Sequence, residues 1–206
     1  AATRAAAIVR EYGPFAGADN IHGVTHDGQR VWAATGARMI AFDPDSGLAT
    51  RTLAHAGDAG TAFDGKHIYQ IAEARIDKID LATGERVASI PAPGHGSDSG
   101  LAWAEGSLWV GQYRERKIHQ IDPETGAVLR TIESNRFVTG VTWVDGELWH
   151  GTWEGDESDI RRIDPESGLV TRGTNGATET LGISIDGQVV GGFPTPSRKL
   201  EFYSPT

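Results

Sequence analysis

The hexapeptide Gly23-Val-Thr-His-Asp-Gly28 and the pentapeptide Asp43-Pro-Asp-Ser-Gly47 decide the fold, because related segments recur along the chain in the same order. Relatives of the hexapeptide stand at residues 60–65, 100–106, 140–146 and 182–187, and relatives of the pentapeptide at residues 80–84, 122–126 and 164–168. The first glycines of successive copies are 37 to 42 residues apart. Two motifs that repeat in register indicate a repeat protein.

Each repeat predicts four short β-strands. The glycine-led strand ends at Asp-Gly or Glu-Gly, which is a hairpin signal, and a second apolar strand such as Leu108-Trp109 follows. A third strand, such as Lys117–Ile121, leads into the Asp-Pro-x-Thr/Ser-Gly turn, where proline fits the turn and glycine a positive φ. A fourth strand, such as Val128–Ile132, ends the unit. This period and strand number are typical of a β-propeller blade.

We therefore predict an all-β fold, a single five-bladed β-propeller domain over residues 1–206 with four-stranded antiparallel blades. The expected blades are residues 20–54, 58–91, 98–133, 138–173, and 180–206 together with 7–12. The last repeat lacks a fourth strand, and the sequence of residues 7–12 resembles the fourth strands of the other repeats. The N-terminal strand is expected to complete the fifth blade and close the ring, which removes exposed sheet edges.

The composition excludes several classes of protein. The chain has no cysteine, so disulfides, thiolate metal sites and cysteine nucleophiles are excluded. The net charge of −9 argues against binding to nucleic acid, and no apolar run approaches the roughly 18 residues of a membrane span. No intact signal peptide is visible. We therefore expect a soluble monomer, cytoplasmic by default, and periplasmic or secreted if a signal peptide has been removed.

The strand order separates the loops into two faces of the predicted disc. The Asp-Gly and Asp-Pro turns fall on one face, which we call the hairpin face. The segments that precede each first strand, and those between second and third strands, fall on the opposite face, which we call the loop face. The loop face varies more between repeats, and functional residues usually lie on loops carried by a rigid scaffold. We expect the functional site there, at the mouth of the central channel.

Imidazole and carboxylate groups gather on the predicted loop face. The residues that we predict for proton transfer are His22, His95, Asp98, His150 and Glu154. Glu154 adjoins Trp153, and an apolar neighbour can raise the pKa of a carboxyl group. His22, His95 and His150 could instead bind a divalent metal, although the sequence requires no cofactor. Alternatively, His95 and Asp98 could form a plain turn in which the aspartate caps backbone amides.

A second set of residues is predicted to position the substrate. Trp153 lies in a segment, Trp149–Glu157, that reads as a long loop, and it has no counterpart in the other repeats. Gln112, Tyr113 and Arg136 are predicted to act with it. Arg136 could hold a carboxylate or phosphate of the substrate, or it could pair with a neighbouring acidic residue.

The motif formed by Trp149, Trp153 and Asp156, followed by Arg162-Ile-Asp-Pro-Glu-Ser-Gly168, resembles bacterial and plant glutamine cyclotransferases. These are five-bladed propellers that convert N-terminal glutamine to pyroglutamate without an obligatory metal. The resemblance extends to about residue 171. Asn20–Val24 and Val138–Val141 depart from the polar motifs that the family carries near its pocket. The resemblance therefore implies the fold and leaves the reaction open.

The C-terminal segment Phe193–Ser204 resembles a segment of molybdopterin oxidoreductases, without a cofactor ligand that can be assigned. It is interpreted either as a divergent fifth blade or as a foreign segment recruited into that blade. No nucleophile elbow, P-loop or His-Glu-x-x-His motif is present. We predict an enzyme with an acid–base or metal-assisted site, of cyclotransferase, lyase or hydrolase type, acting on a small molecule or peptide. The alternative is a non-catalytic propeller module that binds such a ligand.

Overall fold

A computed structural model describes residues 8–173, 182–185 and 188–191. Blade 1 contains β1 (Gly23–His26), β2 (Val31–Ala34), β3 (Met39–Phe42) and β4 (Ala49–Leu53). Blade 2 contains β5 (Thr61–Phe63), β6 (His67–Ala72), β7 (Arg75–Asp80) and β8 (Arg86–Pro91). Blade 3 contains β9 (Asp98–Ala104), β10 (Ser107–Gln112), β11 (Lys117–Ile121) and β12 (Val128–Glu133). Blade 4 contains β13 (Phe137–Val144), β14 (Glu147–Glu154), β15 (Glu157–Ile163) and β16 (Val170–Gly173).

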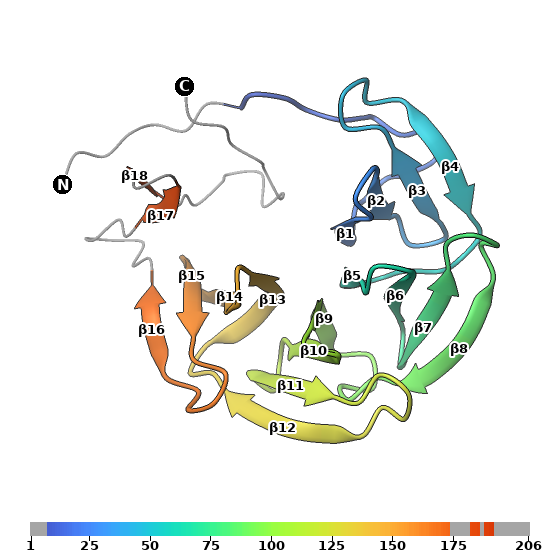
Figure 1. Ribbon diagram of the computed structural model, residues 1–206. Helices are drawn as coiled ribbons and strands as arrows, with labels where there is room; N and C mark the ends of the chain where they lie inside the picture. Colours follow the sequence, from blue (N-terminus) through green and yellow to red (C-terminus); the bar gives the residue numbers. More distant parts are fainter. Residues whose placement is uncertain (1–7, 174–181, 186–187, 192–206) are drawn as a thin grey trace.

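These four blades surround a common centre (Figure 1). Each is an antiparallel sheet with its strands in chain order. The inner strands β1, β5, β9 and β13 contact one another in succession, and β4, β8, β12 and β16 form the outer rim. The predicted all-β propeller with four-stranded antiparallel blades is thereby confirmed. In the described part of the chain, no helix has the length and apolar character needed to span a membrane.

The fifth repeat is described only as the two-stranded sheet of β17 (Gly182–Ile185) and β18 (Gln188–Gly191). The segment Phe193–Ser204 lies outside the described residues. Residues 8–12 belong to none of the described sheets. They lie against blade 1 instead, where the Arg10 guanidinium and the Tyr12 hydroxyl donate hydrogen bonds of 2.6 and 2.7 Å to the carbonyl of Pro44. Ring closure by the N-terminal strand therefore stays a prediction.

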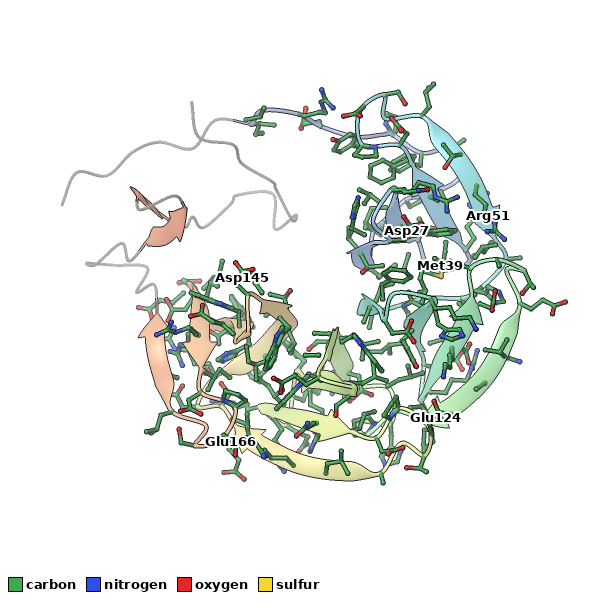
Figure 2. The ribbon with its side chains drawn as sticks, viewed as in Figure 1. Asp27, Met39, Arg51, Glu124, Asp145 and Glu166 are labelled. Atoms are coloured by element: carbon green, nitrogen blue, oxygen red, sulfur yellow. The ribbon has the colours of Figure 1, made fainter. Side chains whose placement is uncertain are left out.

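The Asp-Pro turns form as their residue types dictate. In blade 1, the carboxylate of Asp43 accepts hydrogen bonds from the backbone amides of Ser46 (2.7 Å) and Asp45 (3.0 Å), and Gly47 adopts a φ of 74°. These hydrogen bonds lower the pKa of Asp43 below its ordinary value. The turn repeats in the next three blades, and Glu124 and Glu166 mark it at the rim of blades 3 and 4 (Figure 2).

The glycine-led motif is explained by the close approach of the inner strands. A Cβ atom added to Gly60 would overlap the backbone of Gly100 and Leu101, and one added to Gly100 would overlap that of Gly140 and Val141. Successive inner strands therefore pack backbone against backbone, which a residue with a side chain would prevent. Glycine is required at these positions for packing rather than for a positive φ.

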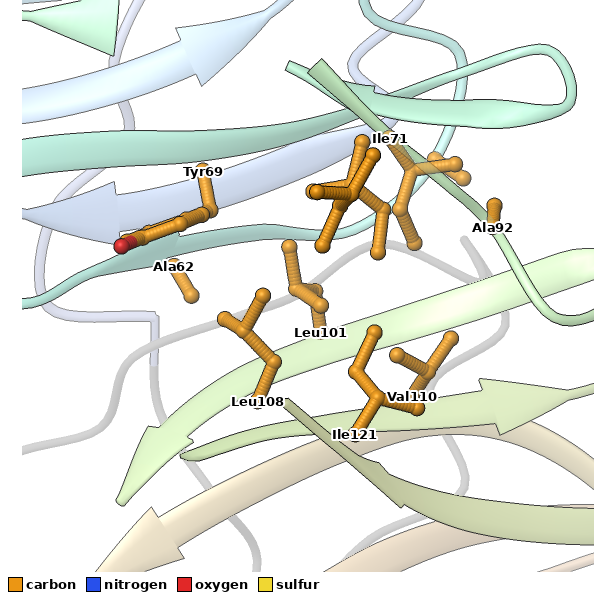
Figure 3. Close-up of a cluster of buried hydrophobic side chains, with 11 residues drawn as sticks. Ala62, Tyr69, Ile71, Ala92, Leu101, Leu108, Val110 and Ile121 are labelled. Atoms are coloured by element: carbon orange, nitrogen blue, oxygen red, sulfur yellow. The ribbon is translucent and has the colours of Figure 1, made fainter. Parts of the chain in front are cut away.

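Apolar side chains fill the space between neighbouring blades. Between blades 2 and 3, Tyr69 and Ile71 pack with Leu101, Leu108 and Val110 (Figure 3). A second cluster joins blade 3 to blade 4, and a third joins blade 1 to blade 2. The hydrophobic core is thus divided into layers between adjacent sheets, and each layer holds a pair of blades in fixed relation.

Candidate functional site

Strand β14 is longer than the sequence predicted. Trp149–Glu154 forms the last six of the eight residues of this strand, and only Gly155 and Asp156 remain in the turn. The predicted long loop is therefore wrong. The residues of Trp149–Glu154 pair with β13 on one side and with β15 on the other. This pairing supplies hydrogen-bond partners for their backbone N–H and C=O groups. As a result His150 lies within the sheet and is only 2% exposed, rather than on a surface loop.

Asp98 occupies the loop-face end of the inner strand of blade 3. Its side chain is buried, and both carboxylate oxygens accept a hydrogen bond from the backbone amide of Gly94, at 2.9 and 3.1 Å. Burial raises the pKa of Asp98 to about 6, although the amides of Gly94 and Gly96 and the charge of His95 oppose the shift. His95 itself is exposed, in the same turn. The aspartate caps a turn, as the structural alternative predicted, and it also titrates close to neutral pH.

Two further buried polar residues, Gln112 and His119, lie in the same blade as Asp98. Gln112 is the partner of Asp98 in the β9–β10 pairing. Its Oε1 atom lies 3.0 Å from Nε2 of His119, whose Nδ1 atom lies 2.8 Å from the hydroxyl of Thr131. Burial lowers the pKa of His119, so this imidazole favours the neutral state. The sequence predicts a solvated His119 at a strand position, and this prediction is wrong, because the side chain is buried between the blades.

Three aromatic rings stack across the junction of blades 3 and 4. Ring centroids of Tyr113 and Phe137 are 4.9 Å apart, and the Trp153 centroid lies 5.9 Å from that of Phe137. The Arg116 guanidinium covers Phe137 at 4.4 Å and forms an ion pair with Glu154 at 3.1 Å. Phe137, Trp153 and Glu154 lie at the ends of β13 and β14, and Tyr113 and Arg116 lie in the turn between β10 and β11. All five are on the loop face. We call this set the aromatic stack.

Arg136 adopts the ion-paired arrangement that the sequence left open. Its guanidinium donates hydrogen bonds to Asp159 at 3.0 Å and to Glu157 at 2.8 Å. The same oxygen of Asp159 also accepts a hydrogen bond from Arg161 at 3.2 Å.

Burial, together with the charge of Arg161, lowers the pKa of His150 to about 4. The imidazole is therefore neutral at physiological pH.

The predicted metal ligands are not brought together. His22 lies exposed before β1, whereas His95 precedes β9 and His150 lies within β14. Among residues 8–173 and the two short strands of the fifth repeat, no group of three or more His, Asp or Glu side chains could hold a metal ion. We derive no metal-dependent step.

The remaining predicted residues lie at the loop-face end of blades 3 and 4 in two groups, on opposite sides of blade 3. Asp98 and Gln112 lie on the side of blade 3 that faces blade 2, and Tyr113 begins the aromatic stack on the other side. The Tyr113 amide donates a hydrogen bond of 3.1 Å to the carbonyl of Ser97, which connects the two groups. Residues that the sequence analysis did not select are Arg116, His119, Phe137 and Asp159. Only the pairing of strands shows their neighbours.

The comparisons with known proteins bear on the fold. The sequence matches no protein-family model and no curated protein. The structure is similar to that of Myxococcus xanthus glutaminyl cyclase, with a TM-score of 0.65, 17% identity, and coverage of 80% of this chain and 74% of that chain. It is also similar to the Neurospora crassa Pan2 WD40 domain, with a TM-score of 0.59, 11% identity, and coverage of 76% and 50%.

A third similar structure is Kuenenia stuttgartiensis hydrazine synthase, with a TM-score of 0.57, 17% identity, and coverage of 78% of this chain and 52% of that chain. The chain thus spans about half the length of the last two structures. At identities of 11% to 17%, these likenesses concern the fold alone. They show that the chain has a β-propeller fold, similar to that of a bacterial glutaminyl cyclase.

Proposed function

We propose that the protein is an enzyme that carries out acid–base chemistry on a small substrate at the loop-face end of blades 3 and 4. The observation that carries this proposal is the state of Asp98, a buried carboxyl group with its pKa raised to about 6. A group with that pKa exists in both protonation states near neutral pH, which suits proton transfer. His95, exposed in the same turn, is proposed to exchange protons with solvent.

The reaction class is proposed from the likeness to glutaminyl cyclase and from the resemblance of the repeats. In cyclisation of N-terminal glutamine, the α-amino nitrogen attacks the side-chain carboxamide carbon and closes a lactam ring. The bond from that carbon to the amide nitrogen breaks, and ammonia leaves. Asp98 would take the proton from the attacking nitrogen and return it to the leaving nitrogen. The step needs no oxidant, reductant or external co-reactant.

The aromatic stack is proposed to hold the substrate. Tyr113, Phe137 and Trp153 present apolar, rigid surface, and aromatic rings bind peptide and ring groups with little loss of conformational entropy. Gln112 and Arg136 are proposed as further contacts, although Arg136 would first have to exchange one of its present ion pairs. His22, His150 and Glu154 stay hypotheses for proton transfer, each tested by its alanine variant.

The test is turnover of a dipeptide that begins with glutamine, followed by ammonia release and by mass spectrometry of the product. We expect kcat/KM to rise with pH through about 6 as Asp98 ionises. The Asp98→Asn variant should lose roughly 100-fold or more in kcat/KM, which is the size of a general acid–base contribution. Asp145→Asn is the matched control, because Asp145 is exposed in a turn on the opposite face.

Full activity of a folded Asp98→Asn variant would contradict the proposal. The alternative function is a non-catalytic module, which the aromatic stack favours because stacked rings bind ligands without chemistry. The module is supported if panels of amides, esters and lactones show no turnover while a peptide or small ligand still binds. Binding should then weaken in Trp153→Ala and stay unchanged in Asp98→Asn. Metal analysis of the purified protein tests the separate hypothesis of metal assistance.

A further inference from the structure

One polar network crosses the sheet of blade 3 from its inner strand to its outer strand. It begins at the Gly94 amide, which donates hydrogen bonds to Asp98 in the inner strand β9. Gln112 is the β10 partner of Asp98, His119 in β11 lies within hydrogen-bonding distance of Gln112, and Thr131 in β12 within that of His119. His119 and Thr131 lie within β11 and β12, and Gln112 connects them to Asp98.

The position of Gly94 shows how closely Asp98 and Gln112 approach each other. A Cβ atom at Gly94 would lie 2.5 Å from Oδ1 of Asp98 and 2.8 Å from Nε2 of Gln112. Both atoms therefore lie beside the same α-carbon. The other end of the Gln112 amide, Oε1, lies 3.0 Å from Nε2 of His119. The amide oxygen is thus turned to His119, and the amide nitrogen lies near Gly94, on the side where Oδ1 of Asp98 also lies.

The orientation of the Gln112 amide fixes the tautomer of His119. The amide oxygen only accepts hydrogen bonds, so Nε2 of His119 must carry the proton and donate it to Gln112. Because the imidazole is neutral, Nδ1 then accepts a hydrogen bond from the hydroxyl of Thr131. The amide nitrogen, which is the positive end of the Gln112 dipole, lies on the same side of the amide as Gly94 and Asp98. A dipole with that orientation favours the charged carboxylate over the neutral acid.

We propose that His119 is a positioning residue, which holds the Gln112 amide with its nitrogen toward Asp98 and so stabilises the carboxylate form of Asp98. Catalytic use of that carboxylate rests on the proposed function. The network itself does not, because the protonation of Asp98 can be measured without turnover. The charged side chains on the strands of blade 3 besides Asp98 are Lys117, Arg130 and Glu133, and the neighbouring turns carry His95 and Glu73. The test leaves all of them unchanged.

The test compares His119→Leu with His119→Gln. The ¹³C signal of the Asp98 carboxyl carbon is followed against pH in each folded variant. In His119→Leu, Gln112 is free to turn its oxygen toward Asp98, and we expect the pKa of Asp98 to rise by about one unit, which is a tenfold change in proton affinity. His119→Gln retains an amide N–H that can replace the Nε2 donor, so it should restore the original titration. His26→Leu, at an exposed histidine, is the control.

Two further variants keep the test decisive if His119→Leu does not fold. Gln112→Leu removes the amide itself and should raise the pKa of Asp98 in the same direction. Thr131→Val alters only an exposed residue of the outer strand and should give a smaller shift of the same sign, whereas Thr131→Ser gives none. An unchanged Asp98 titration in folded Gln112→Leu or His119→Leu overturns the inference.

The outcomes separate the network from the proposed function. If Asp98→Asn keeps full activity, the proposed function is wrong, whatever the titration shows. If Asp98→Asn is inactive and His119→Leu moves neither the titration nor the acid limb of kcat/KM against pH, the network proposal is wrong. If the Asp98 titration and the acid limb of kcat/KM both move to higher pH in His119→Leu, and His119→Gln restores both, then His119 acts through Gln112 on Asp98.

Discussion

At the scale of single residues, blade 4 carries polar atoms without partners on the side that faces blade 3. Among the described residues, Oγ1 of Thr152, Nδ1 of His150 and Oδ1 of Asp159 are buried and have no hydrogen-bond partner. Thr152 and Asp159 are directly opposite each other in the β14–β15 pairing. An unpartnered buried hydroxyl costs about 1–3 kcal/mol of stability. This part of the sheet is therefore less stable than an apolar version of it would be.

We expect the isosteric change Thr152→Val to stabilise the protein. The variant removes the hydroxyl and keeps the shape of the side chain, which is 1% exposed, so the free energy of unfolding should rise by about 1 kcal/mol. Urea denaturation at pH 7 measures the difference. Thr52→Val, at an exposed position of β4, is the control and should change little. A loss of stability in Thr152→Val would mean that the hydroxyl has a bound partner in solution.

At the scale of elements, the inner strands depend on the absence of side chains. Gly100→Ala would drive a methyl group into the backbone of Val141 in the next blade, and neither strand can move without its sheet. We expect a loss of about 3 kcal/mol, which is the upper range for overpacking. Thermal unfolding monitored by near-UV circular dichroism measures it. Ser89→Ala, on the exposed rim strand β8, should leave the melting temperature within experimental error. Equal stability of both variants would contradict backbone-to-backbone packing.

At the scale of the whole molecule, two buried groups give the stability opposite dependences on pH. Asp98 has its pKa raised from 3.8 to about 6, so folding favours its protonated form, and stability falls as the pH rises through that range. His150 has its pKa lowered from 6.5 to about 4, so the unfolded chain takes up the proton first, and stability falls as the pH drops through that range. The pKa of His119 is also lowered, so His119 likewise makes the stability fall as the pH drops. The two effects oppose each other between about pH 4 and 6.

Single substitutions should reveal each effect. Relative to the unaltered protein, Asp98→Asn should lose stability more steeply as the pH falls from 6.5 to 4, because the opposing contribution of Asp98 is then absent. The stability of His150→Gln, relative to the unaltered protein, should instead increase as the pH falls over the same range. Urea denaturation at intervals of half a pH unit measures both curves. Parallel curves for all three proteins would show that neither group has the described protonation behaviour.

The sequence predicted the fold far better than the site, and the reason is physical. The Asp-Gly and Asp-Pro turns are specified by residues close together in the chain, so the strands of blades 1 to 4 could be predicted from two motifs. Gly151 and Gly155 made β14 look like a loop, and only its pairing with two neighbours shows otherwise. The contacts of Arg136 with Asp159, and of Tyr113 with Phe137, depend on which strand ends meet. That information is not contained in local sequence.

The layered core has a consequence for how the chain is made. In the described part, each blade packs on the blade that immediately precedes it, so most tertiary contacts join residues little more than one repeat apart. Synthesis proceeds from the N-terminus at about 5–20 residues per second, and blade 1 is complete before blade 2 has emerged. A nascent chain can therefore assemble blade by blade on the ribosome, with each finished sheet serving as the template for the next.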